Sequence, residues 1–172
     1  MPINVFLSVG RTFTPRQELF VSAIETHIAK KGLRPRTVGR NEFTSRQPFQ
    51  LIEALMAKSA GVLVIALERV LVETGLEKRG SADQIPISNA TFPTPWNQIE
   101  AALGYAKRLP LLVIRETGVR PEGLLDGRYD WYVHSTDLDP AFVNTPEFNG
   151  TLDSWSKDVR RRAGWLRPRY RS

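Results

Sequence analysis

The sequence contains no cysteine and only two histidines among its 172 residues. Without cysteine, the chain can form no disulfide bond, no thiolate-ligated zinc or iron–sulfur centre and no thiol nucleophile. His27 and His134 lie 107 positions apart, and neither has a second ligand at metal-binding spacing. We therefore expect no metal site, and we assign both histidines structural or surface roles.

Long apolar runs are absent as well. The longest run, residues 61–67, is far shorter than the roughly 18 residues that a membrane-spanning helix needs. The N-terminus has no basic region before an apolar stretch, which a secretory signal would have. With 41% hydrophobic residues, the chain has the composition of one globular domain. We expect a cytoplasmic protein without a membrane partner.

Excess positive charge is confined to the C-terminus. The formal net charge is +6, and residues 157–172 contain seven basic side chains against one acidic side chain, so residues 1–156 sum to zero. A neutral body argues against a dedicated nucleic-acid surface. We divide the chain into one domain over residues 1–164 and a basic tail over residues 165–172. The tail is either a solvated end or a docking site for nucleic acid or an acidic partner.

Apolar strands and amphipathic helices alternate along the sequence. We predict strands over residues 3–7, 33–38, 62–67, 111–114 and 130–133. We predict helix starts at Thr14-Pro15, Pro48, Thr94-Pro95 and Thr151. Pro35 has no N–H to donate and favours a sheet edge, whereas the uninterrupted apolar residues 62–67 favour the centre. This order predicts an α/β fold, a doubly wound and about five-stranded parallel sheet with helices on both faces.

The pattern weakens between Glu68 and Pro95. We predict a short helix over residues 69–76 and then a long loop that contains Gly80 and Pro86. Long loops inside compact domains are more often functional than idle. This loop is either a lid that orders over a neighbouring site or a mobile insertion without a role.

In an open parallel sheet, ligands bind beyond the carboxyl ends of the strands. After the first strand, Ser8–Phe13 offers small residues, a guanidinium and a hydroxyl beside a helix start, which suits a phosphate or a ribose. The sequence has neither a Walker loop nor a Gly-x-Gly-x-x-Gly motif. ATP hydrolysis and the ordinary dinucleotide fingerprint therefore have no support.

The segment Trp96-Asn97-Gln98-Ile99-Glu100 places an indole and a carboxylate one helical turn apart. Gly104, one turn further, is expected to leave open space beside the carboxylate. Because Glu100 precedes the apolar run Ala101–Leu103, we expect a raised pKa for its carboxyl group. The alternative is a surface glutamate near the start of a helix, where the helix dipole favours a carboxylate.

Three segments together resemble the Toll/interleukin-1 receptor (TIR) domain, especially its bacterial enzymatic branch: Val5-Phe6-Leu7-Ser8, Val62–Ala66, and Thr94 to Glu100. In that family a strand ends in Phe-x-Ser and a later motif reads Ser-x-Trp-x-x-x-Glu, and here Thr94 replaces the motif serine. The resemblance covers about residues 3–135. It implies a flavodoxin-like fold and an enzyme that cleaves NAD at the nicotinamide–ribose bond with the motif glutamate, which maps to Glu100.

Cleavage of NAD needs one carboxylate, because nicotinamide is attached as a cation and leaves as a neutral molecule. The ribose then passes through an oxocarbenium-like state that negative charge stabilises. We assign catalysis to Glu100, and we expect Trp96 to form a wall of the site. Phe13 or Phe43 is a candidate for stacking on the substrate. Arg11 and Arg40 are candidates for pairing with the pyrophosphate, the alternative being that they are solvent-facing loop arginines. The full set of substrate-binding candidates is Ser8, Gly10, Arg11, Phe13, Arg40, Phe43, Trp96 and Asn97. NAD is the substrate, and no cofactor is required.

The resemblance further suggests a role in bacterial antiphage defence, with ADP-ribose or a cyclic ADP-ribose as product. We recognise no sensor domain, so we expect activation by a homo-oligomer or by a separate sensor or effector protein. Two alternatives stay open. One is a non-catalytic TIR-like adaptor in which Glu100 is structural. The other is a nucleoside or nucleotide 2-deoxyribosyltransferase-like enzyme, suggested by Gly104-Tyr105-Ala106, although that alignment would place the glutamate of the family at Ala102.

Overall fold

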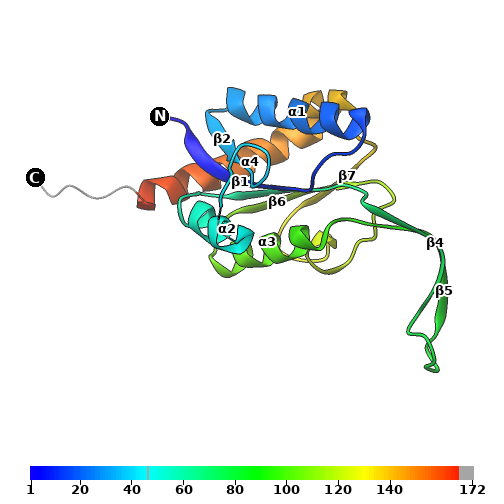
Figure 1. The fold of residues 1–172 in the computed structure, drawn as a ribbon. Coiled ribbons are helices and arrows are strands. Elements are labelled where there is room, and N and C mark those ends of the chain that lie inside the picture. The colour runs from blue at the N-terminus through cyan, green and yellow to red at the C-terminus, as the bar shows by residue number, and fades with distance from the viewer. Residues whose placement is uncertain (46, 167–172) are drawn as a thin grey trace, which may run out of the picture.

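A computed structural model describes residues 1–45 and 47–166 of the chain. Five parallel strands form one sheet in the order β2-β1-β3-β6-β7, and two antiparallel strands, β4 and β5, form a separate hairpin (Figure 1). The strands are β1 (Ile3–Val9), β2 (Leu33–Arg36), β3 (Val62–Ala66), β4 (Val70–Glu77), β5 (Ile85–Phe92), β6 (Leu111–Glu116) and β7 (Val133–Thr136). The helices are α1 (Pro15–Lys30), α2 (Pro48–Ala57), α3 (Pro95–Ala106) and α4 (Pro146–Leu166), with short 3₁₀ turns η1 (Gly123–Leu125) and η2 (Pro140–Asn144).

The helices cover both faces of the sheet. Helices α1 and α4 pack on one face, where Phe20, Ile24 and Leu152 meet the strands, and α2 and α3 pack on the other face, where Ile52 and Ala101 do so (Figure 1). The predicted α/β fold with a doubly wound, five-stranded parallel sheet is therefore confirmed. Its strand order is that of flavodoxin-like folds.

Local signals in the sequence agree with most element starts. The Thr14 hydroxyl accepts a hydrogen bond from the Gln17 N–H at 3.2 Å, and the Thr94 hydroxyl accepts one from the Trp96 N–H at 3.4 Å, so both predicted caps form. Strand β3 is buried along its whole length at the centre, and β2 with Pro35 lies at an edge, as predicted.

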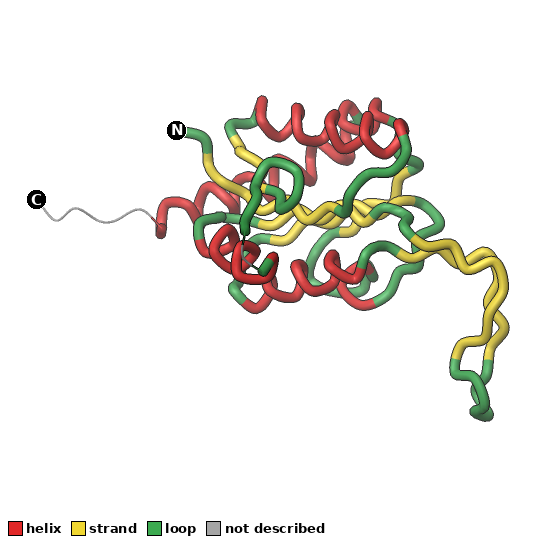
Figure 2. The backbone as a smooth tube through the Cα atoms, in the orientation of Figure 1, coloured by secondary structure: helices red, strands yellow, loops and turns green. Residues whose placement is uncertain are grey.

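The predicted helix over residues 69–76 and the long loop after it are wrong. Val70–Glu77 pairs with Ile85–Phe92 in antiparallel register, and residues 78–84 make the turn. Val70, Val72, Ile85 and Ile87 are β-branched, and β-branched side chains favour strands over a helix. The hairpin projects away from the sheet (Figure 2), so its distal part covers no part of the domain in this structure.

Two boundaries near the C-terminus also differ from the predictions. The last helix begins at Pro146 because the Thr145 hydroxyl caps it by accepting from the Phe148 N–H at 3.3 Å, whereas the Thr151 hydroxyl donates within the helix to the Glu147 carbonyl. The predicted strand at residues 130–133 is shifted to Val133–Thr136. Trp131 packs beside η1 instead, and its indole N–H donates to the Leu124 carbonyl at 2.9 Å.

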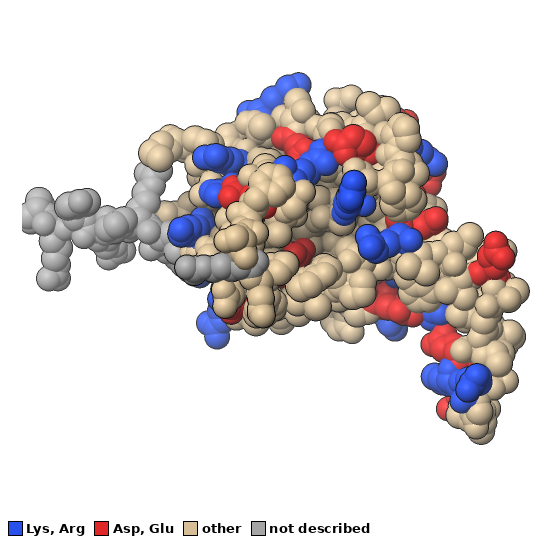
Figure 3. All heavy atoms as spheres, in the orientation of Figure 1, with Lys and Arg blue, Asp and Glu red and all other residues tan. Residues whose placement is uncertain are grey.

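The predicted tail begins inside a helix. Backbone residues 165 and 166 continue α4, and the remainder of the tail, residues 167–172, lies outside the described residues. Over the part of the chain that is described, no helix is both long and apolar enough to cross a membrane. Acidic and basic side chains are intermixed on the face seen in Figure 3, consistent with the neutral body.

Candidate functional site

A pocket of about 240 Å³ opens at the carboxyl edge of the sheet. The segment after β1 contributes Gly10 and Arg11, the start of α3 contributes Trp96 and Glu100, and the base of the hairpin contributes Arg69. Thr94 and apolar side chains, including Ile52 of α2, form the rest of the wall. The pocket lies where the strand order reverses, with β1 continuing to β2 on one side and β3 on the other, which is the usual ligand position in this fold class.

Glu100 is the buried acid of this pocket, with 7% of its surface exposed. Burial raises the pKa of its carboxyl group from 4.5 to about 7, because the charged form loses its hydration, and a hydrogen bond with Ser8 acts in the opposite direction. No described cation forms an ion pair with it. The raised pKa expected from the sequence agrees with this environment.

Ser8 forms a hydrogen bond with the Glu100 carboxylate, and Asn97 positions Ser8. The Asn97 side-chain amide donates to the Ser8 hydroxyl at 3.0 Å and to the Ser8 carbonyl at 3.3 Å. Since the hydroxyl accepts from Asn97, its own proton is free to be donated to Glu100. Both residues are 1% exposed and neither lines the pocket. Of the residues proposed to contact substrate, these two are therefore placed to orient Glu100.

The arginines proposed for the pyrophosphate have different environments. Arg11 lines the pocket, is exposed and has no acidic partner among the described residues. Arg40 instead donates to the carboxylates of Glu18, at 2.7 and 2.9 Å, and of Glu25, at 2.8 and 2.9 Å. The Arg40 guanidinium holds the pKa of Glu18 at about 2. These two carboxylates neutralise the charge of Arg40. Arg40 also does not line the pocket, so the structure does not place it at the site.

The proposed aromatic residues also separate. Trp96 lines the pocket and is 42% exposed. Phe13 and Phe43 are 58% and 75% exposed and do not line it. Only Trp96 is therefore placed as a wall of the site.

Gly104 has a different role from the one expected. A Cβ atom at this position would lie 2.7 Å from Cγ2 of Val62, too close for a real contact. Instead of leaving space beside Glu100, Gly104 lets α3 pack closely on β3. This packing fixes the distance of Glu100 from the strand ends.

Arg69 is the charged pocket residue that sequence reasoning missed. It follows the buried strand β3 by three positions, and its backbone N–H donates to the Phe92 carbonyl at 2.9 Å where the hairpin closes. Its guanidinium has no acidic partner in the described chain. The available signal was its place directly after a strand at the carboxyl edge, where ligand loops begin.

The histidines have structural environments. The His27 ring nitrogen Nε2 lies 2.9 Å from Oδ1 of Asn149, between α1 and α4. His134 is 3% exposed among Tyr132, Phe142 and Phe148, and burial lowers its pKa. Across residues 1–45 and 47–166, no group of three metal-ligating side chains forms.

Comparisons with known proteins give little. No family model matches the sequence, and no curated protein matches it. Among solved structures, the chain is similar to the NanR protein of Vibrio vulnificus complexed with ManNAc-6P, with 12% sequence identity and a TM-score of 0.45. The match covers 95% of this chain and 55% of that chain, so this chain spans about half the length of NanR. A likeness at this level carries no argument about function.

Proposed function

We propose that the protein cleaves the N-glycosidic bond between nicotinamide and ribose in NAD, with Glu100 as the catalytic carboxylate. The observation that carries the proposal is a buried carboxylate that faces a pocket without a cation paired to it. Such a group is unfavourable in the empty protein and gains most from a ligand that brings positive charge. The pyridinium of NAD and the oxocarbenium-like ribose that follows it both bring that charge.

The composition of the pocket favours a cationic leaving group. Glu100 is the one carboxyl group among the described residues that line it. A neutral base must be protonated to leave, which takes a second acid, whereas nicotinamide leaves NAD already neutral. Cleavage of NAD therefore fits this single-carboxylate site better than transfer from a neutral nucleoside does.

The cations at the rim suit the rest of the dinucleotide. The 240 Å³ pocket is smaller than the roughly 300–1,000 Å³ typical of sites that enclose a drug-sized ligand. It has room for the nicotinamide riboside half, with the ring against Trp96. The pyrophosphate would then lie outside, where Arg11 and Arg69 carry unpaired charge.

The resemblance to bacterial TIR enzymes supports the same reaction and suggests its setting. It gives ADP-ribose, when a water oxygen bonds to the ribose carbon and a proton is released, or a cyclic ADP-ribose, when a ring nitrogen of the adenine bonds to that carbon, and antiphage defence as the role. The half-exposed Trp96 leaves the pocket incompletely enclosed. A second copy, or a separate sensor protein, would cover this side and keep bulk water from the carboxylate, so we propose that assembly activates the enzyme.

The test is release of free nicotinamide from NAD, measured by liquid chromatography. The full chain is assayed alone and fused to a homo-oligomeric coiled coil that forces assembly. We expect Glu100→Gln to lower the rate at least about 100-fold, since it removes the main electrostatic stabilisation of the transition state. Glu53→Gln is the matched control, because Glu53 is an exposed glutamate outside the pocket.

Three results would contradict the proposal. A Glu100→Gln variant that keeps more than about a tenth of the activity would remove Glu100 from catalysis. No release of nicotinamide in either assembly state would favour the non-catalytic adaptor. Release of bases from deoxynucleosides, with NAD left intact, would favour a deoxyribosyltransferase-like enzyme.

A further inference from the structure

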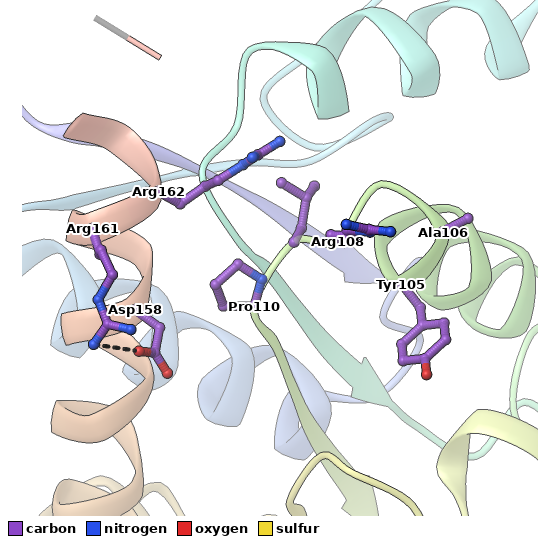
Figure 4. Close-up of a pocket in the computed structure, with 8 residues that line it drawn as sticks. Tyr105, Ala106, Arg108, Pro110, Asp158, Arg161 and Arg162 are labelled. Atoms are coloured by element: carbon purple, nitrogen blue, oxygen red, sulfur yellow. Dashed lines mark ion pairs between the residues drawn. The ribbon is translucent and has the colours of Figure 1, made fainter. Parts of the chain in front are cut away.

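A second hollow, of about 690 Å³, lies near the amino end of the sheet (Figure 4). It is bounded by the end of α3, the segment that leads into β6, and the last turns of α4. We call it the amino-end hollow and define it by Tyr105, Arg108, Pro110, Asp158, Arg161 and Arg162. Its volume falls within the range typical of small-molecule sites.

Three arginines line the amino-end hollow: Arg108 lies in the turn after α3, and Arg161 and Arg162 lie on α4. Arg161 forms an ion pair with Asp158 at 3.3 Å. The guanidinium of Arg108 has no partner in the described residues, and Nε of Arg162 is buried and lacks an acceptor there. In Figure 4, Arg162 extends from α4 toward the side of the hollow that carries Arg108. With three arginines and one aspartate in its lining, the hollow holds a local excess of positive charge.

Arg108 is held in this position by the end of α3. Its backbone N–H donates to the Tyr105 carbonyl at 2.8 Å, and its φ of +55° lies in the left-handed region that favours glycine or asparagine. The backbone alone would therefore select a different residue at this position. The turn directs the side chain into the hollow, where a guanidinium can bind an anion.

The same hollow offers an aromatic surface. Tyr105 is 52% exposed, and its ring packs against Trp131 at 5.3 Å between centroids, which fixes its orientation. A planar base can stack on a fixed, half-exposed ring, and guanidinium groups bind phosphate oxygens with paired hydrogen bonds. We propose that the amino-end hollow binds a nucleotide, with its phosphate at Arg108 and Arg162 and its base against Tyr105.

This site is separate from the pocket of Glu100. The two sites share no lining residue, and along α3 the five residues from Glu100 to Tyr105 correspond to about 7.5 Å. Binding at the amino-end hollow can therefore be measured without any turnover of NAD. An absence of AMP binding there would not contradict the proposed cleavage of NAD.

The test is titration of the full chain with AMP by isothermal calorimetry at low salt, with adenosine and inorganic phosphate titrated separately. We expect AMP to bind at least tenfold more tightly than either part. Arg162→Gln and Arg108→Asn should each weaken AMP binding at least tenfold, asparagine being chosen because it tolerates the left-handed backbone. Tyr105→Ala should reduce the affinity for AMP to that for phosphate and leave phosphate binding unchanged.

Two controls locate the binding. Lys157→Gln removes the same charge from an exposed position on α4 that does not line the hollow, and it should leave the affinity for AMP unchanged. Arg11→Gln alters the pocket of Glu100, and AMP binding that survives this change is binding at the amino-end hollow. A short single-stranded oligonucleotide that binds more tightly than AMP, and loses binding in the same arginine variants, would identify a strand as the source of the nucleotide.

The proposal fails if AMP shows no binding at millimolar concentration. It also fails if the arginine variants bind AMP like the unmodified chain while their melting curves show that they are folded. Loss of AMP binding in Arg11→Gln alone would place the nucleotide in the pocket of Glu100.

Discussion

The two ends of α3 place charged residues in opposite environments. Near its first turns, Glu100 is buried and its pKa is raised to about 7, although a helix N-terminus favours a carboxylate. Just beyond its last turn, Arg108 lines an open hollow and keeps its charge in contact with solvent. A helix dipole contributes about 0.3–1 kcal/mol, whereas a rise of the Glu100 pKa from 4.5 to about 7 corresponds to about 3 kcal/mol. Desolvation therefore outweighs the dipole. Burial of Glu100, at the carboxyl edge of the sheet, costs stability, whereas the solvent-exposed Arg108, at the amino end of the sheet, carries no such cost.

The largest expected effect sharpens this contrast. Because the pKa of Glu100 is higher in the folded chain than its ordinary value of 4.5, the folded chain binds more protons between about pH 4.5 and 7. Its stabilising contribution is complete below pH 4.5 and is lost as the pH rises through 7. Glu100→Gln removes the buried charge, so we expect it to stabilise the fold by about 3 kcal/mol at pH 8 and by little at pH 4.5.

Urea unfolding of the two proteins at both pH values measures this difference. Glu53→Gln is again the control, because an exposed glutamate carries no comparable penalty. Equal stabilities of the unmodified chain and Glu100→Gln at pH 8 would show that Glu100 is hydrated in solution. The contrast between the two ends of α3 would then disappear.

A smaller effect is expected at Ser8, which offsets part of the desolvation. Ser8→Ala removes the hydrogen bond with the Glu100 carboxylate, and hydrogen bonds to charged groups contribute about 1.5–3 kcal/mol. We expect the pKa of Glu100 to rise by about one to two units, as measured by ¹³C NMR titration of labelled glutamate side chains. The rate of nicotinamide release at pH 7 should fall about fivefold to fiftyfold, since less of the carboxylate is ionised.

Ser59→Ala is the matched control for this prediction. Ser59 is also 1% exposed, but its hydroxyl donates to the Leu55 carbonyl at 2.8 Å, away from Glu100. It should leave the pKa of Glu100 unchanged. If Ser8→Ala did the same, the hydroxyl would point elsewhere and the relay from Asn97 would have no role in orienting the acid.

Gly104 is the residue at which α3 packs closely on β3, and its substitution is expected to have the third-largest effect. Gly104→Ala places a Cβ 2.7 Å from Val62. Overpacking costs about 1–3 kcal/mol, and the gain in helix propensity offsets about 1 kcal/mol, so we expect a net loss near 1 kcal/mol by urea unfolding. Gly150→Ala on α4 is the control, since nothing lies within 4 Å of its added Cβ and it should be neutral or stabilising. A Gly104→Ala variant as stable as the unmodified chain would show that α3 is free to shift on β3.

The fold was predictable from the sequence wherever a local rule acts alone. The Thr14-Pro15 and Thr94-Pro95 caps begin helices as expected, and the all-apolar β3 lies at the centre. The same cap and proline occur at Thr145-Pro146, and they, rather than Thr151, begin α4. The hairpin was missed because two strands that pair only with each other bury little, so their sequence lacks the strong apolar signal of β3.

The site was predictable only in part. Spacing placed Trp96 and Glu100 together, and the fold places both at the pocket. Arg11 and Arg40 look alike in sequence, and only the tertiary contacts of Arg40 with Glu18 and Glu25 separate them. Likewise, nothing local shows that Ser8 faces Asn97, because the two are 89 positions apart.

The smallest effect is expected at the tip of the hairpin, which extends beyond the carboxyl end. Residues 78–84 form its turn, and the pair Glu77 and Ile85 can be joined by the two-residue turn Asn-Gly. Because the hairpin points away from the sheet (Figure 2), we expect this shortening to change stability by less than about 0.5 kcal/mol and nicotinamide release by less than about twofold.

Arg69→Gln at the base of the same hairpin provides the contrast. Arg69 lines the pocket, and loss of a charge-assisted bond to phosphate should raise KM for NAD about tenfold with the fold intact. The base of the hairpin would then belong to the site while its tip would not. The opposite result would be a rate of nicotinamide release that falls more than about tenfold in the shortened chain while Arg69→Gln stays active. The tip would then have to reach the substrate, either by folding back as a lid or from a second copy. Assaying the shortened chain with and without forced assembly separates these two cases, because only contact from a second copy depends on assembly.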